Sequence, residues 1–308
     1  MPTVSKKLKN LISCALAAVL MAAACSGCDF IDLSFQNADG ARNSTVAEMP
    51  GGNLEIDYID VGQGDSELVR FPDGRNMIID GGPASAAYDL VSYLQNLGIE
   101  KLDIVVATHP HEDHIGGLDD VINNFEVGEI YMPYIPPSDV PTTVTYENLL
   151  TAVVNRGKTA KELTAGTYII KENGITLRCI SPAFEKYSEM NLYSAVLKLS
   201  FGNTDFLFMG DAEARNEEQI LADGYDVGAD VIKSGHHGSR TSNTAEFLKL
   251  VSPSAVVFSC GLDNSFGHPH EEVVERYEKI GADIWRTDEN GTVSVVSNGR
   301  KYKISSEK

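Results

Sequence analysis

Residues 108 to 117, THPHEDHIGG, place three histidines and two acidic residues within the six positions from His109 to His114. A single histidine in a soluble protein is usually a satisfied core or surface residue. All seven histidines of this chain, however, lie in three places: 109, 111 and 114; 236 and 237; 268 and 270. Imidazole nitrogens and carboxylate oxygens are ligands for zinc, manganese and iron, so this clustering predicts a metal centre.

The spacing of these residues suggests two adjacent metal positions. In an extended segment alternate side chains share one side, so His109, His111 and Asp113 can converge, whereas His114 points to a second position nearby. Two adjacent positions need a bridging anion. Asp211 in MGDAE is the candidate, because it follows an apolar strand and a glycine that permits a tight turn.

Short apolar runs and amphipathic segments must position these residues. Successive strands are predicted at 54–61, 66–71 and 75–80, then a helix at 86–98 and a strand at 101–108 that runs into the histidine cluster.

The second half of the chain repeats this order. Hairpins are predicted at Asn173-Gly174 and near Gly202-Asn203, and later segments alternate between strand and helix. Strands that end at Asp80 and His109 correspond to strands that end at Asp211 and His236. This pattern favours sheets packed between helices.

These motifs together resemble the metallo-β-lactamase fold. THPHEDHIGG is similar to its HxHxDH motif, and Asp80 in IIDGG and Asp211 in MGD are similar to its flanking aspartates. IDVGQGDS (59–66), KSGHHGSRTS (233–242) and NSFGHPHEEV (264–273) resemble the extracellular metallo-β-lactamase-like domain of the DNA-uptake channel protein ComEC. The resemblance runs from about Leu54 to the C-terminus and implies an α/β fold, a four-layered αβ/βα sandwich with metals at one sheet edge.

The resemblance also implies hydrolysis by a metal-activated water. It implies that Asp113 ligates a metal and orients the water, and that His236 completes the metal shell or acts on the substrate. The implied metal ligands are His109, His111, Asp113, His114, Asp211, His236 and His268. The candidate substrate-binding residues are His237, Ser239, Asn191, Ser194 and Asn264. For His237 and Ser239, a role in shaping the turn is an equal alternative.

One departure from the fold's usual pattern affects the metal count. Most members place a further histidine before the bridging aspartate, but no histidine lies between 114 and 211 here. We expect one tight metal at Asp113, His114 and Asp211, and a looser metal or none at His109 and His111. The high share of oxygen ligands favours manganese or magnesium relative to zinc.

The N-terminal 28 residues read as a targeting signal. Lysines at 6, 7 and 9 precede an apolar run of 14 residues, Leu11 to Ala24, which is short for a membrane span. The segment resembles a bacterial lipoprotein signal in which Cys25 is lipidated, with Cys28 as the fallback; plain secretion and an uncleaved anchor are alternatives. We expect a signal peptide at 1–24, a lipidated tether at 25–53 and one metallo-β-lactamase-like domain at 54–308, held outside the cytoplasm at the membrane.

The net charge of −19 bears on the substrate. Proteins that grip nucleic acid through its phosphates usually carry a basic excess, so metal ions would have to attract DNA here. The first hypothesis is a phosphodiesterase or nuclease acting on DNA. The second is a phosphodiesterase on a cell-wall or small-molecule substrate, similar to phosphorylcholine esterases. The third is a metal-binding module with a degenerate site. Oligomeric state, and a separate membrane channel as partner, stay open.

Overall fold

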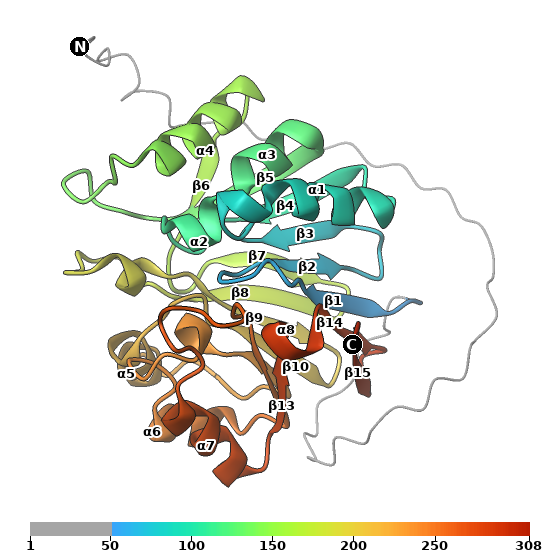
Figure 1. The fold of residues 1–308 in the computed structure, drawn as a ribbon, viewed down its shortest axis with the longest axis vertical. Coiled ribbons are helices and arrows are strands. Elements are labelled where there is room, and N and C mark those ends of the chain that lie inside the picture. The colour runs from blue at the N-terminus through green and yellow to red at the C-terminus, as the bar shows by residue number, and fades with distance from the viewer. Residues whose placement is uncertain (1–50) are drawn as a thin grey trace. The chain divides into compact units, whose positions relative to one another are not determined.

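The computed structural model describes residues 51–308, and the predicted signal peptide, Cys25 and nearly all of the tether lie outside them. The described strands form two mixed sheets (Figure 1). The first sheet has eight strands in the order β15-β14-β1-β2-β3-β4-β5-β6. They are β1 (Leu54–Tyr58), β2 (Glu67–Arg70), β3 (Asn76–Ile79), β4 (Lys101–Val106), β5 (Glu126–Pro133), β6 (Ala160–Leu163), β14 (Val293–Ser297) and β15 (Tyr302–Ser306).

The second sheet has seven strands in the order β13-β12-β11-β10-β9-β8-β7. They are β7 (Tyr168–Glu172), β8 (Ile175–Ser181), β9 (Val196–Phe201), β10 (Thr204–Phe208), β11 (Val231–Lys233), β12 (Ala255–Phe258) and β13 (Asp283–Arg286).

Helices cover the outer face of each sheet. In Figure 1, α1, α3 and α4 lie above the first sheet, and α5, α6 and α7 lie below the second. The helices are α1 (Ala87–Asn96), α2 (Glu112–Ile115), α3 (Leu118–Asn124), α4 (Val144–Asn155), α5 (Ala214–Ala222), α6 (Ala245–Val251), α7 (Glu271–Ile280) and α8 (Thr287–Asn290). Short 3-10 turns are η2 (Ala84–Ala86), η3 (Met190–Tyr193) and η4 (Gly235–Gly238). None of the helices within 51–308 is long and apolar enough to cross a membrane.

Alternation along the strands builds the layers. Met77 and Ile79 of β3 point into a core that both sheets share, while Ile78 between them packs against the helices of the first half. In β10, Phe206 and Phe208 face the shared core and the intervening side chain packs toward the second helical layer. Because successive strand side chains alternate between faces, each inner strand is apolar on both sides. The result is the predicted four-layered sandwich.

The same crossover occurs in each sheet and brings the polar residues to one edge. Strands β3 and β4 pair in parallel, and Asp80 and His109 follow their carboxyl ends. Strands β10 and β11 also pair in parallel, and Asp211 and His236 follow theirs. Loops at the carboxyl ends of parallel strands meet at one sheet edge, which is where ligands bind in such folds.

Most of the expected elements are present, and both predicted hairpins form. Apart from the 3-10 turns, four elements were not predicted: the edge strands β6 and β15, and the short helices α2 and α8. Helix α2 begins at Glu112, so Asp113 does not continue the extended alternation of His109 and His111 that the spacing suggested. Cys179 and Cys260 are buried free thiols.

Candidate metal centre

The first half of the chain supplies His114, held by a buried carboxylate. Asp80 follows β3 in the left-handed region, with φ of 55°. Its side chain accepts hydrogen bonds from the Thr108 amide at 2.7 Å and from the Thr108 hydroxyl. The other contact is His114 Nδ1, 2.7 Å from Asp80 Oδ2. Because Nδ1 is engaged by Asp80, the other ring nitrogen, Nε2, is directed away toward Asp211. Carboxylates that orient a ligating histidine in this way are common around bound metals.

The second half supplies His237 through a strained turn. His236 and His237 both lie in the left-handed region, with φ of 49° and 52°, which is uncommon for residues other than glycine. His237 Nδ1 donates to the Ser259 carbonyl at 2.9 Å. This fixes the ring so that Nε2 lies 3.3 Å from Asp113 Oδ2 and 3.5 Å from Asp211 Oδ1.

Three donor atoms converge without partners of their own. His114 Nε2, His237 Nε2 and Asp211 Oδ1 are buried, yet none of them has a hydrogen-bond partner. His114 Nε2 and Asp211 Oδ1 are 3.1 Å apart, within ion-pair distance but outside hydrogen-bond geometry. Buried polar atoms are almost always satisfied, so three orphans directed at one point fit a divalent metal. Two nitrogens and an oxygen suit zinc, manganese or iron.

A fourth ligand for this position can come from either of two carboxylates. One buried group comprises Asp65, His114, Asp211 and His237, with ligand atoms within 4.8 Å of one another. Asp65 Oδ2, however, lies 2.7 Å from the buried Lys233 ammonium, and Oδ1 lies 3.0 Å from His237 Nδ1, the nitrogen on the far side of that ring. Asp113 Oδ2 instead faces Nε2 of His237. We therefore assign Asp113 to the metal and Asp65 to the support of His237.

A second, sparser group lies beside the first and shares Asp211. His109, His111 and Asp211 offer ligand atoms within 4.8 Å of one another. His109 Nε2 lies 2.9 Å from His111 Nδ1 and 3.7 Å from Asp211 Oδ2. Asp211 thus presents Oδ1 to one group and Oδ2 to the other, the bridging arrangement that its position suggested. This second group offers three protein ligands. That it holds a metal more weakly than the first group stays a prediction.

The carboxylates and imidazoles of the centre shift one another's pKa values. Burial tends to raise the pKa of Asp211, but His114 and His237 outweigh it and hold that pKa well below its usual value. Burial also tends to lower the pKa of His237, yet Asp211 and Asp65 raise it to about 10. For His109, burial and then the charge of His114 lower the pKa well below 6.5. His109 is therefore a neutral imidazole, the form that ligates metals.

The other predicted residues divide between the rim and the scaffold. His236 Nε2 lies 3.6 Å from Asp211 Oδ2, and its Nδ1 lies 3.4 Å from Glu213 Oε1, so His236 stands beside the second group. Asn191 also contacts Glu213, at 3.2 Å, on the same side. The Ser194 hydroxyl accepts from the Asp211 amide at 3.2 Å, which makes it a support of the bridging loop. Ser239 is buried, and its hydroxyl lies 3.1 Å from that of Thr241.

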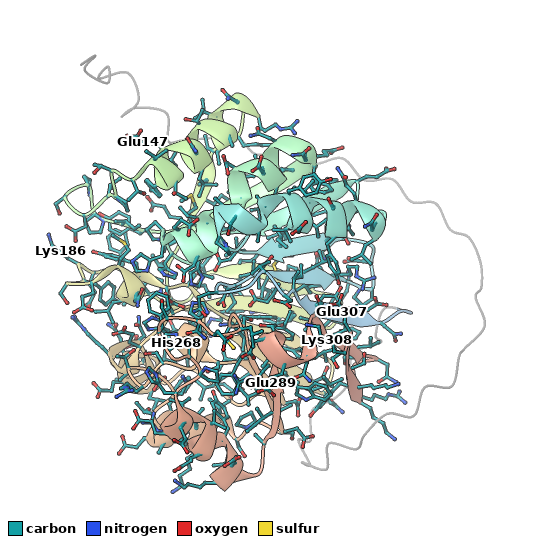
Figure 2. The ribbon with its side chains drawn as sticks, in the orientation of Figure 1. Glu147, Lys186, His268, Glu289, Glu307 and Lys308 are labelled. Carbon is teal, nitrogen blue, oxygen red and sulfur yellow. The ribbon has the colours of Figure 1, made fainter. Side chains whose placement is uncertain are left out.

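Asn264 and His268 belong to the loop between β12 and α7. Asn264 accepts from the His268 amide at 2.9 Å and donates to the Gly261 carbonyl at 2.9 Å, so it holds the loop rather than facing the centre. The His268 ring lies 5.4 Å from the His236 ring and 6.1 Å from the His237 ring, centroid to centroid. Figure 2 shows His268 near the boundary between the two halves. No atom of His268 is among the two compact groups within 51–308, so it lies beside the metal ligands.

Sequence reasoning missed one pair, Asp65 and Lys233. Neither residue was among the candidate site residues. Both are buried, and their charges meet at 2.7 Å beneath His237. A signal for Lys233 was available: a lysine that ends the apolar strand ADVIK is placed where a buried charge needs a partner.

Comparison with known proteins agrees with this fold and site. Residues 59–261 match the metallo-beta-lactamase superfamily, so the chain belongs to that superfamily. With its buried His–Asp cluster, the chain is a metal-dependent hydrolase of this superfamily.

Its sequence relatives include a protein named for competence. The chain is 29% identical over 259 residues to ComE operon protein 3 of Bacillus subtilis, covering 78% of the chain and 32% of that protein. It is 29% identical over 247 residues to competence protein ComA of Neisseria gonorrhoeae, covering 80% of the chain and 32% of that protein. The chain therefore spans about a third of the length of these relatives. The resemblance to ComEC is confirmed at the level of this domain.

Solved structures agree on the fold alone. A metal-dependent hydrolase of the beta-lactamase superfamily aligns over 82% of the chain and 100% of its own, with a TM-score of 0.51 and 14% identity. CmlA, a diiron beta-hydroxylase from Streptomyces venezuelae, aligns over 78% of the chain and 53% of its own, with a TM-score of 0.52 and 15% identity.

Proposed function

We propose that the chain is a metal-dependent phosphodiesterase that cleaves DNA. The observation that carries this proposal is the pair of ligand groups that share Asp211. Paired metals suit the in-line displacement at a phosphodiester, because they can act on both the attacking and the leaving oxygen. Sequence relatives named for competence support DNA as the substrate.

A bound metal would activate water, and the residues of the chain would hold the metal and orient the water. When bound, a divalent metal lowers the pKa of a water molecule toward neutrality and withdraws charge from a phosphoryl oxygen. His109, His111 and Asp211 would hold one ion, and Asp113, His114, Asp211 and His237 the other. Asp113 is the more open of the two carboxylates, with 31% of its side chain exposed, so it can orient the attacking water as well as ligate.

Rim residues would handle the substrate. Asn191 presents an amide beside His236, and this amide can donate to phosphate oxygens. His236 faces Glu213 with one ring nitrogen and the centre with the other, so a proton on this ring can be passed to the leaving oxygen.

The experiment that tests this function uses the purified full chain with added manganese and linear single-stranded DNA. Wild-type protein should cut the DNA, and His111→Ala and Asp113→Ala should each abolish cutting. If the DNA stays intact while the protein binds manganese, the nuclease function is refuted.

The net charge of −19 favours one alternative substrate, a small or zwitterionic phosphodiester of the cell wall. A long acidic surface repels a polyanion but not a phosphorylcholine group. Release of choline phosphate from wall material, with no cutting of DNA under the same conditions, would select this alternative.

We further propose that the protein is a lipoprotein held outside the cytoplasm through Cys25, where a separate membrane channel would be its partner. The support is the lysine-rich, apolar and small-residue order of residues 1–28. Metabolic labelling with a radioactive fatty acid should label the wild type and Cys28→Ser but not Cys25→Ser. Equal labelling of all three would contradict the anchor at Cys25.

A further inference from the structure

An exposed aromatic ring is connected to the metal centre through the ring of His268. Phe266 is 62% exposed, although large apolar side chains are normally covered. One face of its ring stacks on His268, with centroids 5.6 Å apart and the planes inclined by 21°. The exposed part of the ring is open to a second planar group.

The stack continues inward to a metal ligand. The His268 ring is inclined by only 28° to that of His237, at 6.1 Å. Three nearly parallel rings therefore run from the buried centre to the surface. The intermediate ring, that of His268, is buried, and its Nδ1 has no hydrogen-bond partner. A group bound on Phe266 would lie two ring-to-ring steps, of 5.6 Å and 6.1 Å, from the ligand His237.

The loop that carries Phe266 is fixed in place before any ligand arrives. The Asn264 side chain bonds the Gly261 and His268 carbonyls and accepts from the His268 amide. The Gly261 amide donates to the Gln63 side chain at 3.1 Å, which ties the loop to the turn between β1 and β2. A rigid aromatic surface binds with little loss of conformational entropy, so Phe266 is preorganised for stacking.

We propose that Phe266 is a stacking platform for a nucleobase of a substrate whose phosphodiester is held at the metal centre. The substrate class is then a nucleotidyl phosphodiester, with single-stranded DNA as its simplest form. Every base offers a π-face, so this contact is independent of sequence and needs no basic groove, in keeping with the acidic chain. The inference rests on the proposed function and adds to it the group that the loop recognises.

Two oligomers with the same phosphodiester backbone test the platform. One is oligodeoxythymidylate, and the other carries abasic tetrahydrofuran units in place of the nucleosides. With manganese, the wild type should cleave the base-bearing oligomer with a KM about tenfold lower, at similar kcat. Phe266→Leu keeps an apolar side chain but removes the ring, and it should abolish this difference. Phe266→Trp should preserve it.

Leu262→Ala is the matched control, since Leu262 is 72% exposed in the same loop but has no ring. It should keep the tenfold difference. An unchanged KM ratio in Phe266→Leu would overturn the proposal.

Binding separates this inference from the proposed function. If neither oligomer is cleaved, the nuclease function fails, and fluorescence anisotropy with labelled oligomers then decides the platform. Tighter binding of the base-bearing oligomer by the wild type than by Phe266→Leu supports it. Equal binding of both oligomers by both proteins overturns it.

Discussion

His236 and His237 are neighbours in the chain, yet their side chains have different surroundings. His237 is 1% exposed, and its Nε2 is an orphaned atom directed at Asp211. His236 lies at the rim, with Glu213 and Thr241 near its Nδ1. The left-handed turn decides which of the two enters the centre. At the scale of single residues, this difference can be measured.

His237→Gln should weaken manganese binding by about 100-fold or more, because it removes a ligand whose place no other side chain can take. His236→Gln should change the affinity by less than about tenfold, since His236 stands outside the compact groups. Competition with a chromogenic chelator measures both affinities. A larger loss in His236→Gln than in His237→Gln would reverse our assignment.

Metal binding should tighten as the pH rises. Without metal, burial alone would lower the pKa of His237, but Asp211 and Asp65 raise it to about 10. Nδ1 keeps its proton on the Ser259 carbonyl, so a metal at Nε2 must displace the second proton. Between pH 7 and 10, affinity should rise about tenfold per pH unit for each proton displaced.

Calorimetry in buffers of different ionisation enthalpy counts these protons. His237→Gln should release about one proton fewer per bound metal at pH 7 than the wild type. Equal proton release from the two proteins would contradict the role of this ring.

At the scale of elements, the turn between β1 and β2 must fit closely against α2. A Cβ on Gly64 would lie 2.3 Å from the Asp113 carbonyl oxygen, and Gly64 has φ of +155°. Gly64→Ala should therefore destabilise the protein by about 1–3 kcal/mol and weaken metal binding, because α2 carries Asp113 and His114.

Gly74→Ala is the matched control for this prediction. Gly74 also has a positive φ, of +87°, but nothing lies within 4 Å of its Cβ position. It shares the backbone strain without the clash, and its metal affinity should equal that of the wild type. Urea unfolding and chelator competition compare the two variants, and equal losses in both would exclude a specific effect of the contact.

The buried ion pair between Lys233 of β11 and Asp65 joins the two halves. Lys233→Met leaves the Asp65 carboxylate buried without its cation and should lower the free energy of unfolding by about 3–5 kcal/mol. Adding Asp65→Asn should restore part of that loss, since the charge is then gone. Lys279→Met, at an exposed pair with Glu275, should cost less than about 1 kcal/mol. If the losses in free energy of unfolding from the two substitutions simply added in the double variant, Lys233 and Asp65 would not be coupled.

Elements and site differ in how far they could be predicted from the sequence. Strands such as β3 and β10 alternate apolar residues over both faces, and His109, His111, His114 and Asp211 are recognisable by type and spacing. The contact of Asp65 with His237 could not be foreseen, because it joins residues far apart in sequence through one particular packing of the two sheets. Helix α2 could not be foreseen either. In its first turn, Glu112 Oε1 accepts a hydrogen bond at 2.8 Å from the amide of Ala84, a residue distant in sequence.

At the scale of the whole molecule, the metal ligands come from both sheets. His109 and His114 follow β4 of the first sheet, whereas Asp211 and His237 follow β10 and β11 of the second. A bound metal would therefore link the two halves and stabilise the folded chain relative to the unfolded one.

Chelation should therefore lower the melting temperature of the full chain. At a free metal concentration 100-fold above Kd, the metal stabilises the folded state by about 2.7 kcal/mol. For a domain of this size that corresponds to a shift of about 5–10 °C. Scanning calorimetry with manganese and with excess chelator measures the shift, and His237→Gln should show little of it. An unchanged melting temperature in the wild type would mean that no metal bridges the sheets.

The distance along the chain between the ligands also orders events in time. The first of them, His109, and the last, His237, are separated by more than a hundred residues of sequence. A nascent chain has no complete centre until β11 and its turn have been made and both sheets have closed. A chain that crosses a membrane unfolded would carry no ion with it. The ion it acquires would then be set by the metals available where folding ends, rather than by those where translation begins.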